Sequence, residues 1–254
     1  MAQDKKQSFM KGAAILSAST LIVKMLGLLF SIPLANFIDP EGMSHFYNAY
    51  NIFGLFLMLS TAGLPVAVSR MVGTAYSQGR RREGDRVFSV AFWLFFSLGL
   101  LGCLVMFFGA GQIAQWYGSP KSNYAIMALA PTLFFISIES ALRGYFQGRS
   151  NMVPTATSQT IEAVTKVVIG VGLAFAIIQN VEVEPDRWAA VGAIVGVSVS
   201  AALGAIYLLG FKFFQGRHDR RQHWAEEPPL TTRQEMLVSL VRFAVPITIG
   251  SCFL

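Results

Sequence analysis

The chain has 254 residues, of which 54% are hydrophobic and only 13% are charged. Soluble globular domains average about 45–50% apolar and about 25% charged residues, so this composition excludes a soluble, disordered, coiled-coil or nucleic-acid-binding chain and leaves an integral membrane protein. In a membrane protein the formal net charge of +6 orients the helices, and we therefore expect no nucleic-acid partner.

Long stretches without charge predict membrane spans, because a helix needs about 20 apolar residues to cross the bilayer. Residues 42–69, 87–120 and 188–211 carry no charged side chain, and residues 12–38 carry only Lys24. Two further apolar segments contain charges. We expect an all-α bundle over residues 1–211 with six complete spans, at about 12–37, 46–69, 88–111, 123–143, 153–180 and 188–211. A basic cytoplasmic loop at 212–235 and the start of a seventh helix at 236–254 should follow.

The basic residues predict a cytoplasmic N-terminus, because Lys and Arg accumulate in inner loops. With that orientation, the inner segments hold fifteen of the 20 Lys and Arg residues and the outer loops hold two, Lys121 and Arg187. The first apolar segment is too long for a signal peptide, and no small-residue cleavage site follows it. We therefore expect a multi-pass protein of the cell membrane. Because the chain stops within the seventh apolar segment, we expect a piece of a larger transporter.

The first span carries a polar face. That face holds Ser17, Thr20, Lys24, Gly27 and Ser31 at intervals of three or four residues. At about 100° per residue these positions share an arc of about 80°. A mid-span lysine costs about 2.5–3.5 kcal/mol to insert, so we expect this face to line a cavity. Alternatively, Lys24 could reach the membrane interface or pair with a carboxylate.

A second polar arc is predicted on the fifth span. It holds Thr155, Gln159, Glu162, Lys166 and Gly170. Glu162 and Lys166 have the favourable i, i+4 order and could neutralise each other, or they could form a charged wall on the same cavity with Glu162 able to take up a proton. Glu139 and Arg143 form another i, i+4 pair near the cytoplasmic face, which is a candidate gating pair unless Arg143 extends to the interface.

No pattern in the sequence indicates chemistry at a metal or a catalytic centre. The two cysteines, Cys103 and Cys252, are far apart, and the three histidines are scattered. Neither a phosphate-binding glycine loop nor a Ser/His/Asp set is present, so we expect no cofactor, no metal and no enzyme. A stripe of small residues in the sixth span predicts close helix packing. The stripe consists of Gly192, Gly196, Ser200 and Gly204.

The most specific stretch reads ALRGYFQG at 141–148, NMVPTA at 151–156 and SQTIE at 158–162. It resembles the polysaccharide-transport branch of the MATE-like (MOP) exporter superfamily, and within it the group of stage V sporulation protein B and MurJ-type lipid II flippases. The segments IPLA at 32–35, LSTAGLPVA at 59–67 and VPIT at 245–248 are similar to the same family.

This resemblance implies a transporter of about fourteen helices in two lobes that works by alternating access. Such a protein would move a polyprenyl-diphosphate-linked saccharide, lipid II for example, to the outer leaflet for cell-wall or polysaccharide assembly. Its partners would be that substrate, membrane lipids and a second lobe of the same protein. Cationic cavity residues of the family are thought to hold the diphosphate, and Lys24 matches one of them by position. Ser31 and Lys166 stand where relatives often have arginine, which alters the cation count and the grip on phosphate.

Three other functions remain open at this stage. A cation-coupled multidrug antiporter of the same fold would more naturally place acidic residues in this cavity, whereas the first span carries Lys24 and no carboxylate. A non-transporting membrane scaffold would not need buried polar faces. A membrane-embedded glycosyltransferase would need a catalytic constellation, and none is visible.

Overall fold

The computed structural model describes residues 2–61, 63–219, 232, 234–240 and 242. Over these residues the protein is all-α and contains no strand. The α-helices are α1 (Ala2–Phe37), α2 (Pro40–Thr61), α3 (Leu64–Ser77), α4 (Arg81–Phe108), α5 (Ala110–Trp116), α6 (Asn123–Gly148), α7 (Val153–Thr165), α8 (Gly172–Asn180) and α9 (Pro185–Asp219). A 3₁₀-helix, η1 (Pro120–Ser122), and a π-helix, η2 (Lys166–Val171), lie between them.

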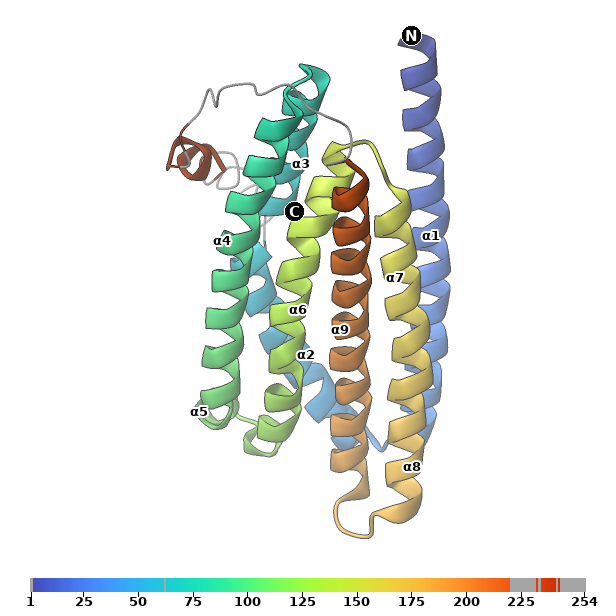
Figure 1. Cartoon of the computed structure of the whole chain (residues 1–254). Helices are drawn as coiled ribbons and strands as arrows, with labels where there is room; N and C mark the ends of the chain where they lie inside the picture. The colour runs from blue at the N-terminus through green and yellow to red at the C-terminus, as the bar shows by residue number, and fades with distance from the viewer. Residues whose placement is uncertain (1, 62, 220–231, 233, 241, 243–254) are drawn as a thin grey trace.

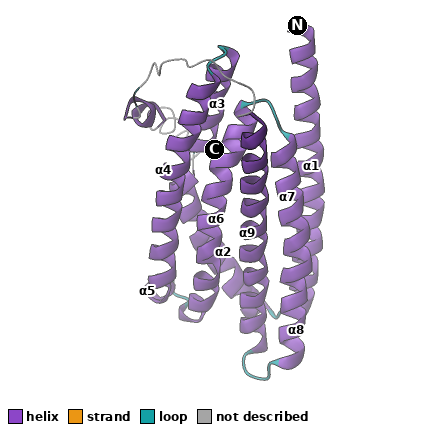
Figure 2. Cartoon of the chain, viewed as in Figure 1, coloured by secondary structure: helices purple, strands orange, loops and turns teal. Residues whose placement is uncertain are grey.

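The long helices run side by side, with α6 and α9 in the middle, α4 on one flank and α7, α8 and α1 on the other (Figure 1). Loops at both ends of the bundle join the long helices (Figure 2). One end carries the N-terminus and the α3–α4 and α6–α7 connections, and we call it the N-terminal end. The α1–α2, α5–α6 and α8–α9 connections lie at the opposite end. This alternation is the arrangement of a multi-pass bundle.

Five helical segments of the described chain are long and apolar enough to span a membrane. They are Ala14–Phe37, Arg81–Phe108, Pro120–Gly148, Val153–Asn180 and Pro185–Gln215. Five of the six expected spans therefore have a matching helix, and the expected total of six is not confirmed.

The missing span is the one predicted at 46–69, which is divided between α2 and α3. Gly63 adopts a left-handed backbone with φ of 70°, and Pro65 occupies the first turn of α3. Proline lacks an N–H group and disfavours a helical conformation in the residue before it, so α2 cannot continue through this point. Residues 234–240, near the expected start of a seventh helix, are helical, but residues 243–254 lie outside the described part of the chain.

Two other expected helices differ in detail from the structure. The predicted span 153–180 contains the π-helix η2, so it does not have one uniform periodicity. The predicted span 188–211 belongs to α9, which continues to Asp219 and so takes up the first residues of the expected loop at 212–235. The middle of that loop, residues 220–231, lies outside the described residues.

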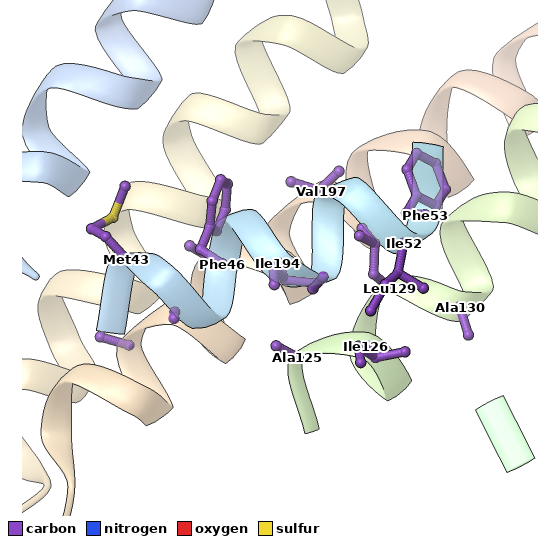
Figure 3. Packing of buried hydrophobic residues seen from close by; sticks show 14 of the residues in the cluster. Met43, Phe46, Ile52, Phe53, Ala125, Ile126, Leu129, Ala130, Ile194 and Val197 are labelled. Carbon is purple, nitrogen blue, oxygen red and sulfur yellow. The ribbon is translucent and has the colours of Figure 1, made fainter. Parts of the chain in front are cut away.

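Buried apolar residues form two clusters at different levels of the bundle. The first lies toward the end opposite the N-terminus, where Phe46 and Ile52 of α2 pack with Leu129 of α6 and Ile194 of α9 (Figure 3). The second cluster joins α3, α4, the later part of α6 and α9, and has Tyr145 among its members. Along α6, residues up to Leu133 belong to the first cluster and residues from Ile138 onward to the second.

Glycines bring α9 close to its neighbours, as the small-residue stripe predicts. A Cβ atom on Gly192 would lie 2.5 Å from Ile177 Cδ1. A Cβ on Gly196 would overlap the backbone of Gly170 in η2. The same stripe continues to Gly204, which faces charged side chains.

Candidate functional site

A group of buried and half-buried charged side chains lies where α6, α7 and α9 come together. Glu139 of α6 is completely buried, and its Oε2 atom lies 3.0 Å from Nη2 of Arg143. The same Nη2 atom donates a hydrogen bond to Oε1 of Glu162 on α7. One guanidinium therefore bridges two carboxylates from different helices. We call Glu139, Arg143, Glu162 and the adjoining Gly204 the Arg143 cluster.

Gly204 of α9 closes the third side of the Arg143 cluster. A Cβ atom at this position would lie 2.7 Å from Glu162 Oε1 and 2.8 Å from Glu162 Cγ. Real Cβ atoms essentially never come this close to a neighbour. The carboxylates therefore occupy the space that a side chain at position 204 would need.

The charges of the Arg143 cluster are not fully satisfied within the described residues. Neither oxygen of Glu139 accepts a hydrogen bond of good geometry, and Nε of Arg143 has no acceptor. The contact between Glu139 and Arg143 is thus an ion pair without a well-directed hydrogen bond. Two carboxylates and one guanidinium leave a formal excess of one negative charge when all three are ionised. Removing Arg143 would leave two buried carboxylates facing each other, which is strongly unfavourable.

Lys166 does not complete this cluster by pairing with Glu162. Its Nζ atom lies 5.0 Å from the ring centroid of Phe30 on α1, within the range of a cation–π interaction. The Glu162 carboxylate pairs with Arg143 instead. Of the two alternatives from the sequence, the neutralising pair of Glu162 and Lys166 is replaced by an ion pair from Glu162 to α6 and a contact from Lys166 to α1.

The other expected residues of α7 face the bundle to different degrees. Thr155 is completely buried, and no acceptor for its hydroxyl lies among the described residues. Gln159 is half-buried. Thr155, Gln159 and Glu162 lie within α7, and Lys166 begins the π-helix that follows it.

The polar face predicted on α1 lies on the surface of the described bundle. Ser17, Thr20, Lys24 and Ser31 are all exposed. Thr20 donates its hydroxyl to the carbonyl of Leu16 at 2.8 Å, one turn earlier in the same helix. Six residues separate Lys24 from Phe30, so at about 100° per residue their side chains point about 120° apart. Lys24 and Lys166 therefore lie on different sides of α1, and no described residue joins them in one cavity.

Ser19 is a polar contact of α1 that the sequence reasoning missed. Its hydroxyl is buried and donates to the carbonyl of Ala156 at 3.0 Å, and it also lies 3.3 Å from Thr160 Oγ1. This contact fixes which side of α1 faces α7. The serines at positions 17 and 19 have the same chemistry, so no sequence signal separates the buried one from the exposed one.

A second polar cluster, also missed, joins α4, α6 and α9 near the N-terminal end. Tyr145, from the ALRGYFQG stretch, donates to Asp85 Oδ1 at 2.6 Å. Nζ of Lys212 donates to the same oxygen at 3.1 Å and lies 3.6 Å from the Tyr145 ring centroid. Arg149 donates to the Tyr145 hydroxyl at 2.9 Å. These contacts tie three helices together.

At the opposite end an exposed charge network ties the connecting loops together. Glu184 accepts a hydrogen bond from Arg187 at 2.6 Å, and another of its oxygens lies 3.2 Å from Nζ of Lys121. Lys121 also lies 3.4 Å from Glu41 at the start of α2. Hydrogen bonds from Arg187 and then Lys121 hold the pKa of Glu184 below its ordinary value.

Comparison with known proteins places these features in a family. The sequence profile described as polysaccharide biosynthesis protein matches residues 9–254. In Bacillus subtilis (strain 168), stage V sporulation protein B is 29% identical over 250 residues, which cover 98% of this chain and 47% of that protein. The lipid II flippase MurJ of the same organism is 27% identical over 179 residues, covering 67% of this chain and 33% of that protein.

Solved structures with similar folds come from MATE-like transporters. A crystal structure of MATE in complex with MaD5 superposes with a TM-score of 0.77 at 14% identity and covers 96% of this chain and 53% of that chain. A MOP superfamily transporter from Pyrococcus furiosus gives a TM-score of 0.71 at 15% identity, covering 94% and 52%. At these identities the likeness shows the fold alone. Stage V sporulation protein B and the MATE structure each match nearly all of this chain, and the chain spans about half the length of each. The chain belongs to the polysaccharide biosynthesis protein family of multi-pass membrane proteins with the MATE-like (MOP) fold.

Proposed function

We propose that the native gene product moves a polyprenyl-diphosphate-linked saccharide, such as a lipid II-like molecule, from the inner to the outer leaflet of the cytoplasmic membrane. Membership of the polysaccharide biosynthesis protein family supports this proposal. So does the similarity to a protein named as a lipid II flippase. The choice of an anionic, diphosphate-bearing substrate rests on the lysines Lys24 and Lys166.

The observation that carries the proposal is the unequal pairing of charges at membrane depth. Arg143 holds both Glu139 and Glu162, whereas neither Lys24 nor Lys166 has an ion-pair partner among the described residues. An unpaired ammonium within the bilayer is unfavourable and favours the approach of an anion. A diphosphate supplies such an anion. A cationic drug would instead need carboxylates free of a cation, and Glu139 and Glu162 both contact the Arg143 guanidinium.

A full binding site needs a further wall, because Lys24 and Lys166 lie on different sides of α1. We propose that a second lobe packs against the polar face of α1 and encloses Lys24, Ser17, Thr20 and Ser31. The relatives are about twice as long as this chain, which is consistent with two lobes. In this arrangement Lys24 contacts the diphosphate first and Lys166 is the second cation. Glu139 and Arg143 act as a gating pair, because Arg143 also binds Glu162 and so joins α6 to α7.

Substitution of Lys24 in the native gene product tests this function. Lys24→Gln should abolish flipping while the protein still inserts in the membrane, because the most unfavourable group of the first span has been removed. Lys24→Arg should keep part of the activity, since the charge remains. Arg81→Gln serves as the control, because Arg81 is exposed at the α3–α4 turn. The measurement is the amount of lipid-linked saccharide in the outer leaflet at matched membrane abundance.

Normal flipping by Lys24→Gln would remove the cation site and shift the assignment to a scaffold or a drug antiporter. Loss of flipping in Arg81→Gln to the same extent would show that the assay reports general damage and not substrate binding.

The proposed orientation places the N-terminal end of the bundle in the cytoplasm. It rests on the fifteen-to-two distribution of basic residues between the inner segments and outer loops expected from the sequence. Reporter domains inserted in the turns at 78–80 and 149–152 should be cytoplasmic, and one inserted at 181–184 should be external. The reverse result at two of these positions would overturn the orientation.

A further inference from the structure

Lys166 occupies an unusual place in the bundle. It is the first residue of the π-helix η2, where the regular α-helical periodicity of α7 ends. π-Helical turns are rare and occur frequently at functional sites. The side chain of Lys166 is half-buried, so a ligand can still reach it. Its ammonium lies 5.0 Å from the centroid of the Phe30 ring.

The Phe30 ring is held in place from several sides. It is only 4% exposed, and its centroid lies 6.1 Å from that of Phe46 on α2. It also fills the space above Gly170, where a Cβ atom would come within 2.7 Å of its Cε2 atom. A ring fixed by α2 and η2 presents a constant face to the ammonium.

Glu162, one turn before Lys166, attracts the ammonium through space but forms no close ion pair with it. Glu162 receives its hydrogen bond from Arg143. Among the described residues, the contact of the Lys166 ammonium is therefore an aromatic face and not an anion. A cation–π contact holds an ammonium more weakly than a charge-assisted hydrogen bond to a phosphate oxygen.

We infer that Phe30 is a positioning residue that holds the Lys166 ammonium in the empty protein and releases it to a diphosphate group when a ligand binds. This inference rests on the proposed function, because it assumes that Lys166 contacts the ligand. Binding must break the contact with Phe30, so Phe30 weakens the apparent affinity. When Lys166 leaves Phe30 for the diphosphate, one contact between α1 and η2 is lost. Substrate binding thereby weakens the packing of α1 on the bundle.

The test compares Phe30→Leu, Lys166→Gln and the double variant in the purified native gene product in nanodiscs. The probes are farnesyl diphosphate and inorganic diphosphate. Phe30→Leu should lower the Kd for farnesyl diphosphate by about 2- to 30-fold, the range that corresponds to one cation–π contact. The same change should have no effect in the Lys166→Gln background. Phe30→Tyr should bind as the parent does, because the ring is kept.

Each alternative result has a separate meaning. An equal effect of Phe30→Leu in both backgrounds, or no effect in either, would overturn the role of Phe30. An effect with farnesyl diphosphate but not with inorganic diphosphate would assign it to packing of the lipid chain and would overturn the role as well. An unchanged affinity in Lys166→Gln alone would instead refute the proposed ligand contact of Lys166.

A second measurement tests the contact between Phe30 and Lys166 without any ligand. It also serves if Phe30→Leu folds poorly. Thermal unfolding of Phe30→Met, Lys166→Gln and the double variant should give non-additive shifts in Tm, because each change removes the same contact. Saturating farnesyl diphosphate should make the shifts additive. Phe37→Leu is the control, since Phe37 lies on the same helix as Phe30 and its ring packs against Phe175 on α8. Additive shifts without ligand would show that the contact contributes nothing.

Discussion

Replacing Gly204 by alanine should disturb the Arg143 cluster, and Gly210 offers a matched control in the same helix. The added methyl group at position 204 would lie 2.7 Å from Glu162 Oε1, whereas a methyl at position 210 would meet nothing within 4 Å. Overpacking of a closed site costs about 1–3 kcal/mol. Alanine is favoured over glycine inside a helix by about 1 kcal/mol, and this gain is common to both variants.

Gly204→Ala should therefore have a free energy of unfolding about 1–3 kcal/mol lower than that of Gly210→Ala. Reversible unfolding in mixed micelles, followed by helical circular dichroism, measures this difference. Because both positions lie in α9, the effect of the detergent on helix propensity cancels in the comparison. A Gly204→Ala variant as stable as Gly210→Ala would show that the two carboxylates and α9 are not in the close contact described above.

Two further predictions concern α1 and the loop network. Ser19→Ala should lower the free energy of unfolding by about 1 kcal/mol, because a buried hydrogen bond to the Ala156 carbonyl is lost. Ser17→Ala, at an exposed position, should change it little. Equal effects of the two variants in the same unfolding assay would contradict the packing of α1 on α7. The pKa of Glu184 is lowered in the folded protein by Arg187 and Lys121, so its contribution to stability is present above its ordinary pKa of 4.5 and is lost as the pH falls through the lower folded value. As the pH falls from about 5 to about 3, the Tm of Glu184→Gln should therefore decrease less than the Tm of the parent protein. If the two proteins lose Tm equally over this range, the ionised Glu184 carboxylate does not contribute to stability.

The positions of the membrane-spanning helices could be predicted largely from the sequence, because the requirement for about 20 uncharged residues acts locally along the chain. The division between α2 and α3 does not follow from the charge gap of residues 42–69, which predicts one span; Gly63 and Pro65 are the local signals of the break. The π-helix at Lys166 could not be predicted, since it coincides with the close approach of Gly170 to Gly196 on another helix. Contacts between distant helices do not follow from local periodicity.

In the candidate site too, contacts within one helix could be predicted from the sequence, and contacts between helices could not. The i, i+4 spacing predicted the contact of Glu139 with Arg143, and the structure confirms it. The contact of Glu162 with Arg143 depends on how α7 packs on α6. The contact of Lys166 with Phe30 depends on how α1 packs on η2. The assignment of Lys24 to a binding cavity stays a prediction, because the described bundle leaves that side of α1 exposed.

The sparse contacts of α1 have a consequence for the order in which the protein assembles in the membrane. α1 packs mainly against α7 and η2, which are synthesised more than a hundred residues later. At about 5–20 residues per second, translation leaves an interval on the order of ten seconds before the partner emerges. During that time α1 must stay inserted through its own apolar surface, while the partners of Ser19 on α7 and of Phe30 on η2 have yet to be made. Exposed leucine, isoleucine and methionine side chains along this helix are therefore needed early in biogenesis, before its contacts with α7 and η2 exist.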